Sequence, residues 1–226
     1  TYTVTDSEGL TASVTRRVIV TAAERPSTVV PEGRTVYLTF DDGPSANTER
    51  LLDTLDAYGV KATFFVTNCN EDYTGCIGEI ARRGHTVAIH SATHDYRAIY
   101  QSEEAYFADL CRMQEIIFEQ TGEYARLVRF PGGSSNTVSC YNPGIMSRLT
   151  SDLNDMGYAY FDWNVSAADT ASNATRYTVI ENIKEGVPQH DYSVVLQHDT
   201  NGFSVDAVEE ILTWGIQNGY SFRALD

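Results

Sequence analysis

The chain has 226 residues, and 16 Lys and Arg against 31 Asp and Glu give it a net charge of -15. A surface this acidic disfavours binding to nucleic acid, and no basic cluster offsets it. Hydrophobic residues make up 42% of the chain, which is enough to fill a core. No apolar run of eighteen residues predicts a membrane span, and the length suits one domain with a short addition.

The beginning of the chain predicts a β-hairpin. Tyr2 and Val4 alternate with polar residues, and after a turn a second strand is expected from Val14 to Val20. An isolated hairpin is marginally stable, and this one resembles the last two strands of bacterial Ig-like repeats. We therefore assign residues 1–22 to the C-terminal fragment of an Ig-like β domain and residues 23–34 to a linker.

From Thr35 onward, short apolar runs alternate with amphipathic stretches. The apolar runs predict seven strands, near residues 35–40, 61–66, 85–90, 126–131, 158–163, 193–198 and 221–225. The amphipathic stretches predict helices over residues 47–58, 75–83, 102–121, 144–156, 176–185 and 205–218. Strands that alternate with helices indicate an α/β fold built on a parallel sheet.

The first of these strands ends in two adjacent carboxylates, Asp41 and Asp42. Neighbouring side chains at a strand end point in different directions, so the two can have different roles. Gly43 and Pro44 then end the strand and turn the chain. Taken alone, the pattern also fits a turn in which one Asp caps the following helix.

A pair of histidines, His90 and His94, follows the third strand. Two histidines four residues apart share a face of a helical turn and can bind one metal ion. One oxygen from Asp41 or Asp42 would complete a His-His-carboxylate site. Such a ligand set suits zinc, and also cobalt, nickel, manganese or iron. A lone histidine such as His85 is more often structural.

Three more apolar runs also end in residues that can do chemistry. Arg129 opens the segment RFPGG, Asp162 and Trp163 close FDW, and His198 stands two residues after Leu196. In an α/β barrel the active site lies at the carboxyl ends of the strands. The repetition therefore predicts a barrel with these side chains gathered at one end.

These five motifs, in this order, resemble those of the polysaccharide deacetylases of carbohydrate esterase family 4, the NodB-homology domain. The segment RFPGGSSN resembles the peptidoglycan-deacetylase-like branch of Gram-positive bacteria. The resemblance covers residues 35–226, which we assign as the catalytic domain. It implies an incomplete, distorted (β/α)7 barrel and an extracellular or cell-wall-associated protein.

The resemblance also implies a division of labour. Asp42, His90 and His94 would bind a divalent metal, with zinc expected and cobalt, nickel or manganese as substitutes. Such an ion polarises a carbonyl and activates water. Asp41 would be the general base, kept ionised and oriented by Arg129.

His198 would protonate the leaving amine, and Asp162 would hydrogen-bond to it and raise its basicity. The backbone amide of Gly132, a position where the family often has Tyr, would donate to the oxyanion. Trp163 would form an apolar wall and Leu196 a pocket for the acetyl methyl, although both also fit as plain core residues.

The sequence therefore predicts a metal-dependent hydrolase that removes acetyl groups from N-acetylglucosamine units of a cell-wall polysaccharide, with peptidoglycan favoured. Deacetylation of chitin oligomers or of acetyl-xylan is an alternative within the same chemistry. A non-catalytic glycan-binding module and a surface adhesin are alternatives from other classes. The presence of both Asp41 and His198 argues against a catalytically silent module.

An even number of cysteines, four, permits two disulfides in an exported protein. Cys69 and Cys76 would close a short loop and are the favoured pair, whereas the pairing of Cys111 and Cys140 stays open. The absence of a CxxC motif disfavours a zinc cluster.

Overall fold

The structure, a computed structural model, describes residues 2–5, 11–14 and 33–226. Strands β1 (Tyr2–Thr5) and β2 (Thr11–Val14) pair antiparallel, with Tyr2 opposite Val14. Beyond Val14, the predicted second strand lies outside the described residues. The likeness to an Ig-like domain and the boundaries of residues 1–22 and 23–34 stay predictions.

One parallel sheet organises residues 33–226. Its strands are β3 (Thr35–Asp41), β4 (Thr63–Thr67), β5 (Thr86–Ser91), β6 (Leu127–Val128), β7 (Ala159–Tyr160), β8 (Val165–Ser166), β9 (Tyr192–His198) and β10 (Ser221–Phe222). They are ordered β7-β6-β5-β4-β3-β9-β8, and β10 pairs with the beginning of β3. The predicted α/β class and distorted barrel are confirmed.

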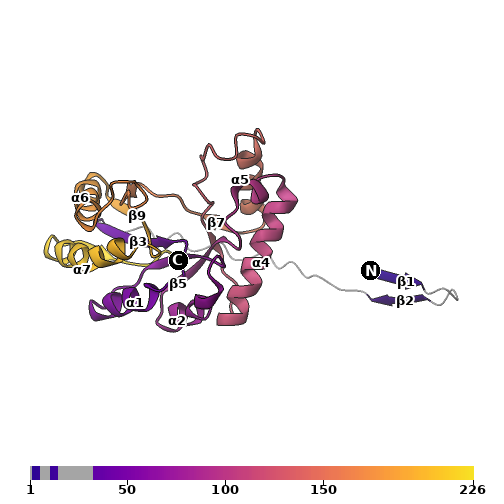
Figure 1. Ribbon diagram of the computed structural model, residues 1–226, viewed down its shortest axis with the longest axis horizontal. Coiled ribbons are helices and arrows are strands. Elements are labelled where there is room, and N and C mark those ends of the chain that lie inside the picture. The colour runs from indigo at the N-terminus through magenta and orange to yellow at the C-terminus, as the bar shows by residue number, and fades with distance from the viewer. Residues whose placement is uncertain (1, 6–10, 15–32) are drawn as a thin grey trace.

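The helices surround this sheet (Figure 1). They are α1 (Thr48–Ala57), α2 (Cys76–Arg82), α3 (Tyr96–Ile99), α4 (Glu103–Thr121), α5 (Ile145–Asp155), α6 (Arg176–Gly186) and α7 (Gly202–Gln217), with 3-10 turns at Glu71–Tyr73 and Val187–Gln189. Neighbouring helices contact one another in the order α6, α7, α1, α2, α4, α5. All six predicted helices are present, and the short α3 is an addition. No described helix combines the length and apolar composition needed to cross a bilayer.

The longest helix, α4, shows why the sequence located the helices well. The Ser102 hydroxyl accepts a hydrogen bond from the Ala105 amide at its start, and Gly122 ends it with a φ of 75°. A side chain that accepts at the first turn and a glycine in the left-handed region are the usual signals for the two helix ends. The apolar face between them is buried, as the sequence predicts: Tyr106, Leu110, Met113 and Ile117.

The strands separate two hydrophobic clusters because their side chains alternate between the two faces of the sheet. Leu38 and Phe40 of β3 belong to the outer cluster, which lies between the sheet and the helices. Tyr37 of β3 belongs to the inner cluster, and so does one residue from each of five other segments: Phe65, Ala88, Leu127, Val194 and Leu225. The inner cluster therefore fills the interior of the barrel.

The barrel is incomplete because β7 and β8 are the two edges of the sheet. The single strand predicted over residues 158–163 is wrong in this respect. β7 ends at Tyr160, the chain crosses to the other edge, and Val165 then pairs with Val195 of β9. A two-residue strand carries too little apolar pattern to be recognised from the sequence.

The predicted disulfide between Cys69 and Cys76 is wrong, because all four cysteines are free thiols in the structure. The Cys69 sulfur lies 3.5 Å from the carbonyl oxygen of Thr93. Cys76 begins α2 and is partly buried, and burial raises the pKa of its thiol. A 3-10 turn, Glu71–Tyr73, lies between the two cysteines in the chain.

His85 is a buried structural histidine between α2 and β5. Its Nδ1 accepts a hydrogen bond from the Ala62 amide, while its Nε2 is buried without a hydrogen-bond partner. Burial and the positive charge of Lys61 lower the pKa of His85 to about 4; Asp56 opposes the shift and Arg83 adds to it. The folded protein therefore holds this imidazole neutral.

We expect this group to make stability depend on pH. An unfolded histidine has a pKa of about 6.5, so between pH 6.5 and 4 the unfolded state binds a proton that the folded state does not. The contribution is complete above pH 6.5 and is lost as the pH falls toward 4, by on the order of 3 kcal/mol. Urea unfolding of the wild type and of His85→Asn at several pH values measures it. If the difference in stability between the two proteins does not change with pH, the assignment is wrong.

Candidate active site

Strand alternation places three of the predicted residues, Asp41, His90 and His198, inside the barrel at one end. Asp41 lies on the same face of β3 as the inward-facing Tyr37, and it pairs with His198 at the end of β9. His90 has the same parity as the inward-facing Ala88 on β5. Because the strands are parallel, their carboxyl ends meet at one edge, and the side chains converge there.

Asp42, His90 and His94 form a candidate metal site. The Asp42 Oδ1 atom lies 3.4 Å from His90 Nε2 and 3.3 Å from His94 Nε2. Within the described residues these three side chains form the one such cluster, and their ligand atoms all lie within 4.8 Å of one another. Asp42 Oδ1 is buried without a hydrogen-bond partner, which fits an oxygen reserved for a cation. The predicted metal ligands therefore come together.

The charge states of Asp42 and His94 fit metal binding. At His90, burial acts to lower the pKa, but the charges of Asp41 and Asp42 outweigh it and raise the pKa. Burial acts to raise the pKa of Asp42, but the neighbouring His90, His94 and His198 outweigh it and lower the pKa to about 2. Burial and the neighbouring His90 lower the pKa of His94. An ionised carboxylate beside a neutral imidazole is the form in which these groups ligate a metal.

His90 is held in one tautomer by the backbone. Its Nδ1 lies 2.7 Å from the carbonyl oxygen of Arg129. A carbonyl oxygen can only accept, so Nδ1 carries the proton and the Nε2 lone pair faces Asp42. A hydrogen bond from the ring nitrogen that does not bind the metal fixes the orientation of a metal-binding imidazole.

His90 and His94 meet through a tight turn, and the predicted helical turn is wrong. His90 belongs to β5, whereas His94 has a φ of 51° in the left-handed region, as does Asp42 with a φ of 69°. A residue other than glycine in that region costs on the order of 1–3 kcal/mol and persists only where its surroundings hold it.

Asp109 of α4 holds this turn, and the sequence analysis missed it. Its carboxylate accepts hydrogen bonds from the Ser91 hydroxyl at 2.7 Å and the Ala92 amide at 2.9 Å. It also accepts from the Thr93 amide at 3.0 Å and the Thr93 hydroxyl at 2.7 Å. The Ser91 hydroxyl in turn accepts from the His94 amide at 2.8 Å.

Arg129 pairs with Asp41, as predicted. Its Nη1 lies 2.8 Å from Asp41 Oδ1 and 2.6 Å from the Thr39 hydroxyl. Its other nitrogens donate to the carbonyl oxygens of Phe161 and Asp162. Arg129 is fully buried and Asp41 is 2% exposed, so the pair lies in a medium where an unpaired charge would be costly.

His198 is bound by Asp169, and the predicted hydrogen bond from Asp162 is wrong. His198 Nδ1 lies 2.8 Å from Asp169 Oδ1, and the His198 amide donates to Asp169 Oδ2. Burial acts to lower the pKa of His198, but the hydrogen bond and charge of Asp169 outweigh it, with help from Asp41 and Asp42, and raise the pKa. The free Nε2 lies 3.9 Å from Asp42 Oδ2, on the metal side of the site.

Asp162 instead binds the loop after β6. Its carboxylate accepts hydrogen bonds from the amide and the hydroxyl of Ser134. Trp163 packs beside Arg129, with the guanidinium carbon 5.7 Å from its ring centre. The error has a clear origin: the acid that reaches His198 follows β8, and that strand was not predicted.

The remaining predicted residues line the same end of the barrel. Leu196 has the parity of His198 on β9 and is 9% exposed. Gly132 has a φ of 78° and borders the ring of Tyr96. Burial and the charge of Asp42 raise the pKa of the Tyr96 hydroxyl, which shows that Tyr96 lies near Asp42. The sequence analysis did not identify this aromatic residue.

The first and last motifs are packed directly together. The buried Asp199 carboxylate occupies the space that a Cβ at Gly43 would need, so only glycine fits there. Asp199 Oδ2 also accepts a hydrogen bond from the Thr48 hydroxyl at 2.6 Å. Burial raises the pKa of Asp199 to about 6. This contact fixes the loop that carries Asp42 against the end of β9.

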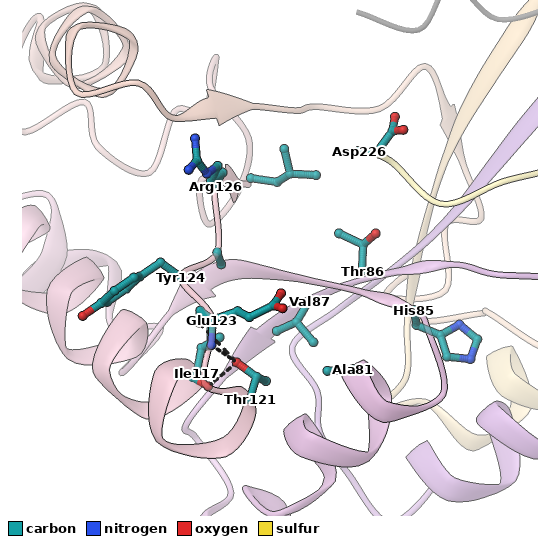
Figure 2. Close-up of a pocket in the computed structure, with 12 residues that line it drawn as sticks. Ala81, His85, Thr86, Val87, Ile117, Thr121, Glu123, Tyr124, Arg126 and Asp226 are labelled. Atoms are coloured by element: carbon teal, nitrogen blue, oxygen red, sulfur yellow. Dashed lines mark hydrogen bonds between the residues drawn. The ribbon is translucent and has the colours of Figure 1, made fainter. Parts of the chain in front are cut away.

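A pocket of about 370 Å³ lies at the opposite end of the barrel (Figure 2). It is lined by the beginnings of β5 and β6, at Thr86 and Leu127, and by Tyr124 and Asp226. None of the residues of the candidate site lines it. Because barrel enzymes use the other end of their strands, this pocket is not the candidate active site.

Comparisons with known proteins agree with this geometry. Residues 28–159 match the family model described as polysaccharide deacetylase. A peptidoglycan-N-acetylglucosamine deacetylase of Bacillus cereus is 31% identical over 199 residues, which cover 85% of this chain and 70% of the relative. The catalytic domain of the peptidoglycan N-acetylglucosamine deacetylase from Eubacterium rectale superposes with a TM-score of 0.87 and 55% identity, over 91% of this chain and 94% of that chain. A polysaccharide deacetylase from Bacillus cereus superposes with a TM-score of 0.74 and 30% identity, over 85% and 92% of the two chains.

The correction at His198 can be tested directly by titrating its imidazole by NMR in the metal-free protein. The Asp169→Asn substitution removes the acceptor that stabilises the imidazolium, so it should lower the pKa of His198. Asp162→Asn is the matched control and should leave that pKa in place. A lowered pKa of His198 in Asp162→Asn, with no change in Asp169→Asn, would show that Asp162 is the partner of His198.

Proposed function

Because this chain belongs to the polysaccharide deacetylase family, we propose that it removes acetyl groups from N-acetylglucosamine units of cell-wall peptidoglycan. The observation that carries the proposal is the Asp42, His90 and His94 cluster with Asp41 and His198 on its flanks. The substrate named for the relatives from Bacillus cereus and Eubacterium rectale supports peptidoglycan over other acetylated glycans.

The cluster offers one carboxylate and two imidazoles, a set that leaves coordination positions for water and substrate. We propose zinc as the ion; cobalt, nickel and manganese accept similar ligands. When bound, such an ion polarises the acetamide carbonyl and lowers the pKa of water. Asp42, His90 and His94 would hold it.

Asp41 is the proposed general base, which takes a proton from the water that attacks the acetamide carbonyl. Its hydrogen bond to Arg129 leaves Oδ2 free to face the cleft, 3.9 Å from His90 Nε2. The hydrogen bond from the guanidinium also fixes the orientation of this carboxylate.

His198 is the proposed general acid, which donates a proton to the departing amine. Its Nδ1 is engaged by Asp169, so its Nε2 is the nitrogen that faces the cleft. The carboxylate stabilises the imidazolium form, which is the form that can donate.

Three further residues would bind the substrate. The Gly132 amide would donate to the oxyanion of the tetrahedral intermediate. Leu196 would contact the acetyl methyl, and Trp163 would form part of the wall. Asp162 would hold the loop that begins at Pro131, through its hydrogen bonds to Ser134, and so act on the site through that loop.

We also propose that the protein acts outside the cytoplasm, at the cell wall of a Gram-positive bacterium, because a peptidoglycan substrate lies there. The resemblance of the first 22 residues to an Ig-like domain supports display at that surface. The charge of -15 is compatible with an N-acetylglucosamine unit, which is uncharged and requires no electrostatic steering.

The proposal predicts which substrates release acetate. The zinc-loaded protein should act on peptidoglycan and on N-acetylglucosamine oligomers in preference to acetyl-xylan. Chelation should abolish release, and zinc or cobalt should restore it. The double variant His90→Ala with His94→Ala should resist that rescue, whereas His190→Ala, at an exposed histidine, should not. Full activity after chelation would remove the metal from the proposal, and preference for acetyl-xylan would remove the substrate.

The proton carriers predict a second set of results. Asp41→Asn should retain zinc and lose on the order of 10²–10⁴-fold in kcat. His198→Ala should lose a similar factor on an acetamide, because an amine leaves only when protonated. It should lose far less on an aryl acetate, whose phenolate leaves without help. Equal losses of His198→Ala on the two substrates would assign the general acid to another group.

A further inference from the structure

Tyr96 stands at the rim of the candidate site without an assigned role. It begins α3, two residues after the metal ligand His94, and it is half-buried. Its ring packs edge-on against the His94 ring, with the centres 5.0 Å apart and the planes at 66°. An aromatic side chain in this position borders the candidate metal site.

Tyr96 also borders Gly132. A Cβ at Gly132 would lie 3.5 Å from Tyr96 Cε1 and 3.2 Å from the Asn136 Cβ. Cε1 is adjacent to the ring carbon that carries the hydroxyl, so the hydroxyl end of the ring lies beside Gly132. The φ of 78° at Gly132 further disfavours a side chain there. Tyr96 thus supplies the side chain that Gly132 lacks.

The backbone around Tyr96 is firmly held. The Asp95 carboxylate accepts hydrogen bonds from the Arg97 and Ala98 amides, which caps α3. The Tyr141 hydroxyl donates to the Tyr96 carbonyl oxygen at 2.6 Å. The Tyr100 hydroxyl donates to the carbonyl oxygen of Pro131 at 2.8 Å, which ties α3 to the Gly132 loop.

The Tyr96 hydroxyl itself is different, because no residue of the described part of the chain makes a hydrogen bond to it. A tyrosine that is held in place with an unused hydroxyl beside a cluster of polar groups is suited to binding a ligand. A sugar ring is such a ligand, because it offers the tyrosine both an apolar face and hydroxyl groups.

We propose that Tyr96 is a substrate-positioning residue that packs its ring against the N-acetylglucosamine unit being deacetylated and hydrogen-bonds to one of its sugar oxygens. The inference rests on the proposed function, because it requires a glycan in the cleft. It assigns part of the recognition of the sugar to α3, a helix that carries none of the proposed catalytic groups.

The test compares Tyr96→Phe with the wild type, and Tyr177→Phe on α6, at a tyrosine that is 69% exposed, is the matched control. Loss of one neutral hydrogen bond should raise KM for an N-acetylglucosamine oligomer about 3- to 10-fold and leave kcat nearly unchanged. Activity on 4-nitrophenyl acetate, which has no sugar, should not change. The zinc affinity from calorimetry should not change either. Tyr177→Phe should match the wild type throughout.

Other outcomes overturn the inference. Equal losses on both substrates, or weaker zinc binding, would show that Tyr96 acts through His94 and not on the sugar. An unchanged KM for the oligomer would show that the hydroxyl does not bind it. Calorimetric binding of the oligomer to both proteins separates this inference from the proposed function. A wild type that binds the oligomer without releasing acetate would refute deacetylation, while the ratio of the two Kd values would still decide the role of Tyr96.

Discussion

A fully buried guanidinium is the constraint on which this site depends. Arg129 is the largest side chain with no exposed surface, and it lies inside the barrel among its strands. Its charge is tolerated because Asp41, Thr39 and two carbonyl oxygens accept hydrogen bonds from it. The Phe65 ring, 4.1 Å from the guanidinium carbon, covers one face. Removing either charge would leave the other buried and unpaired, so Asp41 and Arg129 depend on each other.

The same residue also links the separate parts of the site. The Arg129 carbonyl oxygen fixes the tautomer of His90, and its guanidinium binds the segment after β7 through Phe161 and Asp162. The metal cluster, the proposed base and the open edge of the barrel therefore share one anchor. The proposed acid is held separately, by Asp169 on the other edge of the sheet. The proposed base and the proposed acid are therefore held in place by different side chains.

Two of the four described non-glycine residues with a positive φ are candidate metal ligands. Asp42 and His94 both occupy the left-handed region, which a packed surrounding must enforce. Asp109 enforces it at His94 through four hydrogen bonds, and the contact between Asp199 and Gly43 supports the loop that carries Asp42. Such supports hold ligands in place before a metal binds, which is how outer residues tune a metal centre.

The sequence by itself determined the alternation of strands and helices, the barrel class and the ends of helices such as α4, because apolar periodicity and capping residues are local signals. It also placed Asp41, Asp42, His90, Arg129 and His198 at strand ends, and parallel strands bring such ends together. Only the tertiary structure decided that Asp169 binds His198, because that depends on β8, a strand of two residues with almost no pattern of its own. The support from Asp109 and the approach of Tyr96 to Gly132 are likewise contacts between distant segments, which no local pattern encodes. The turn that joins His90 to His94 has a backbone conformation that is set by this packing.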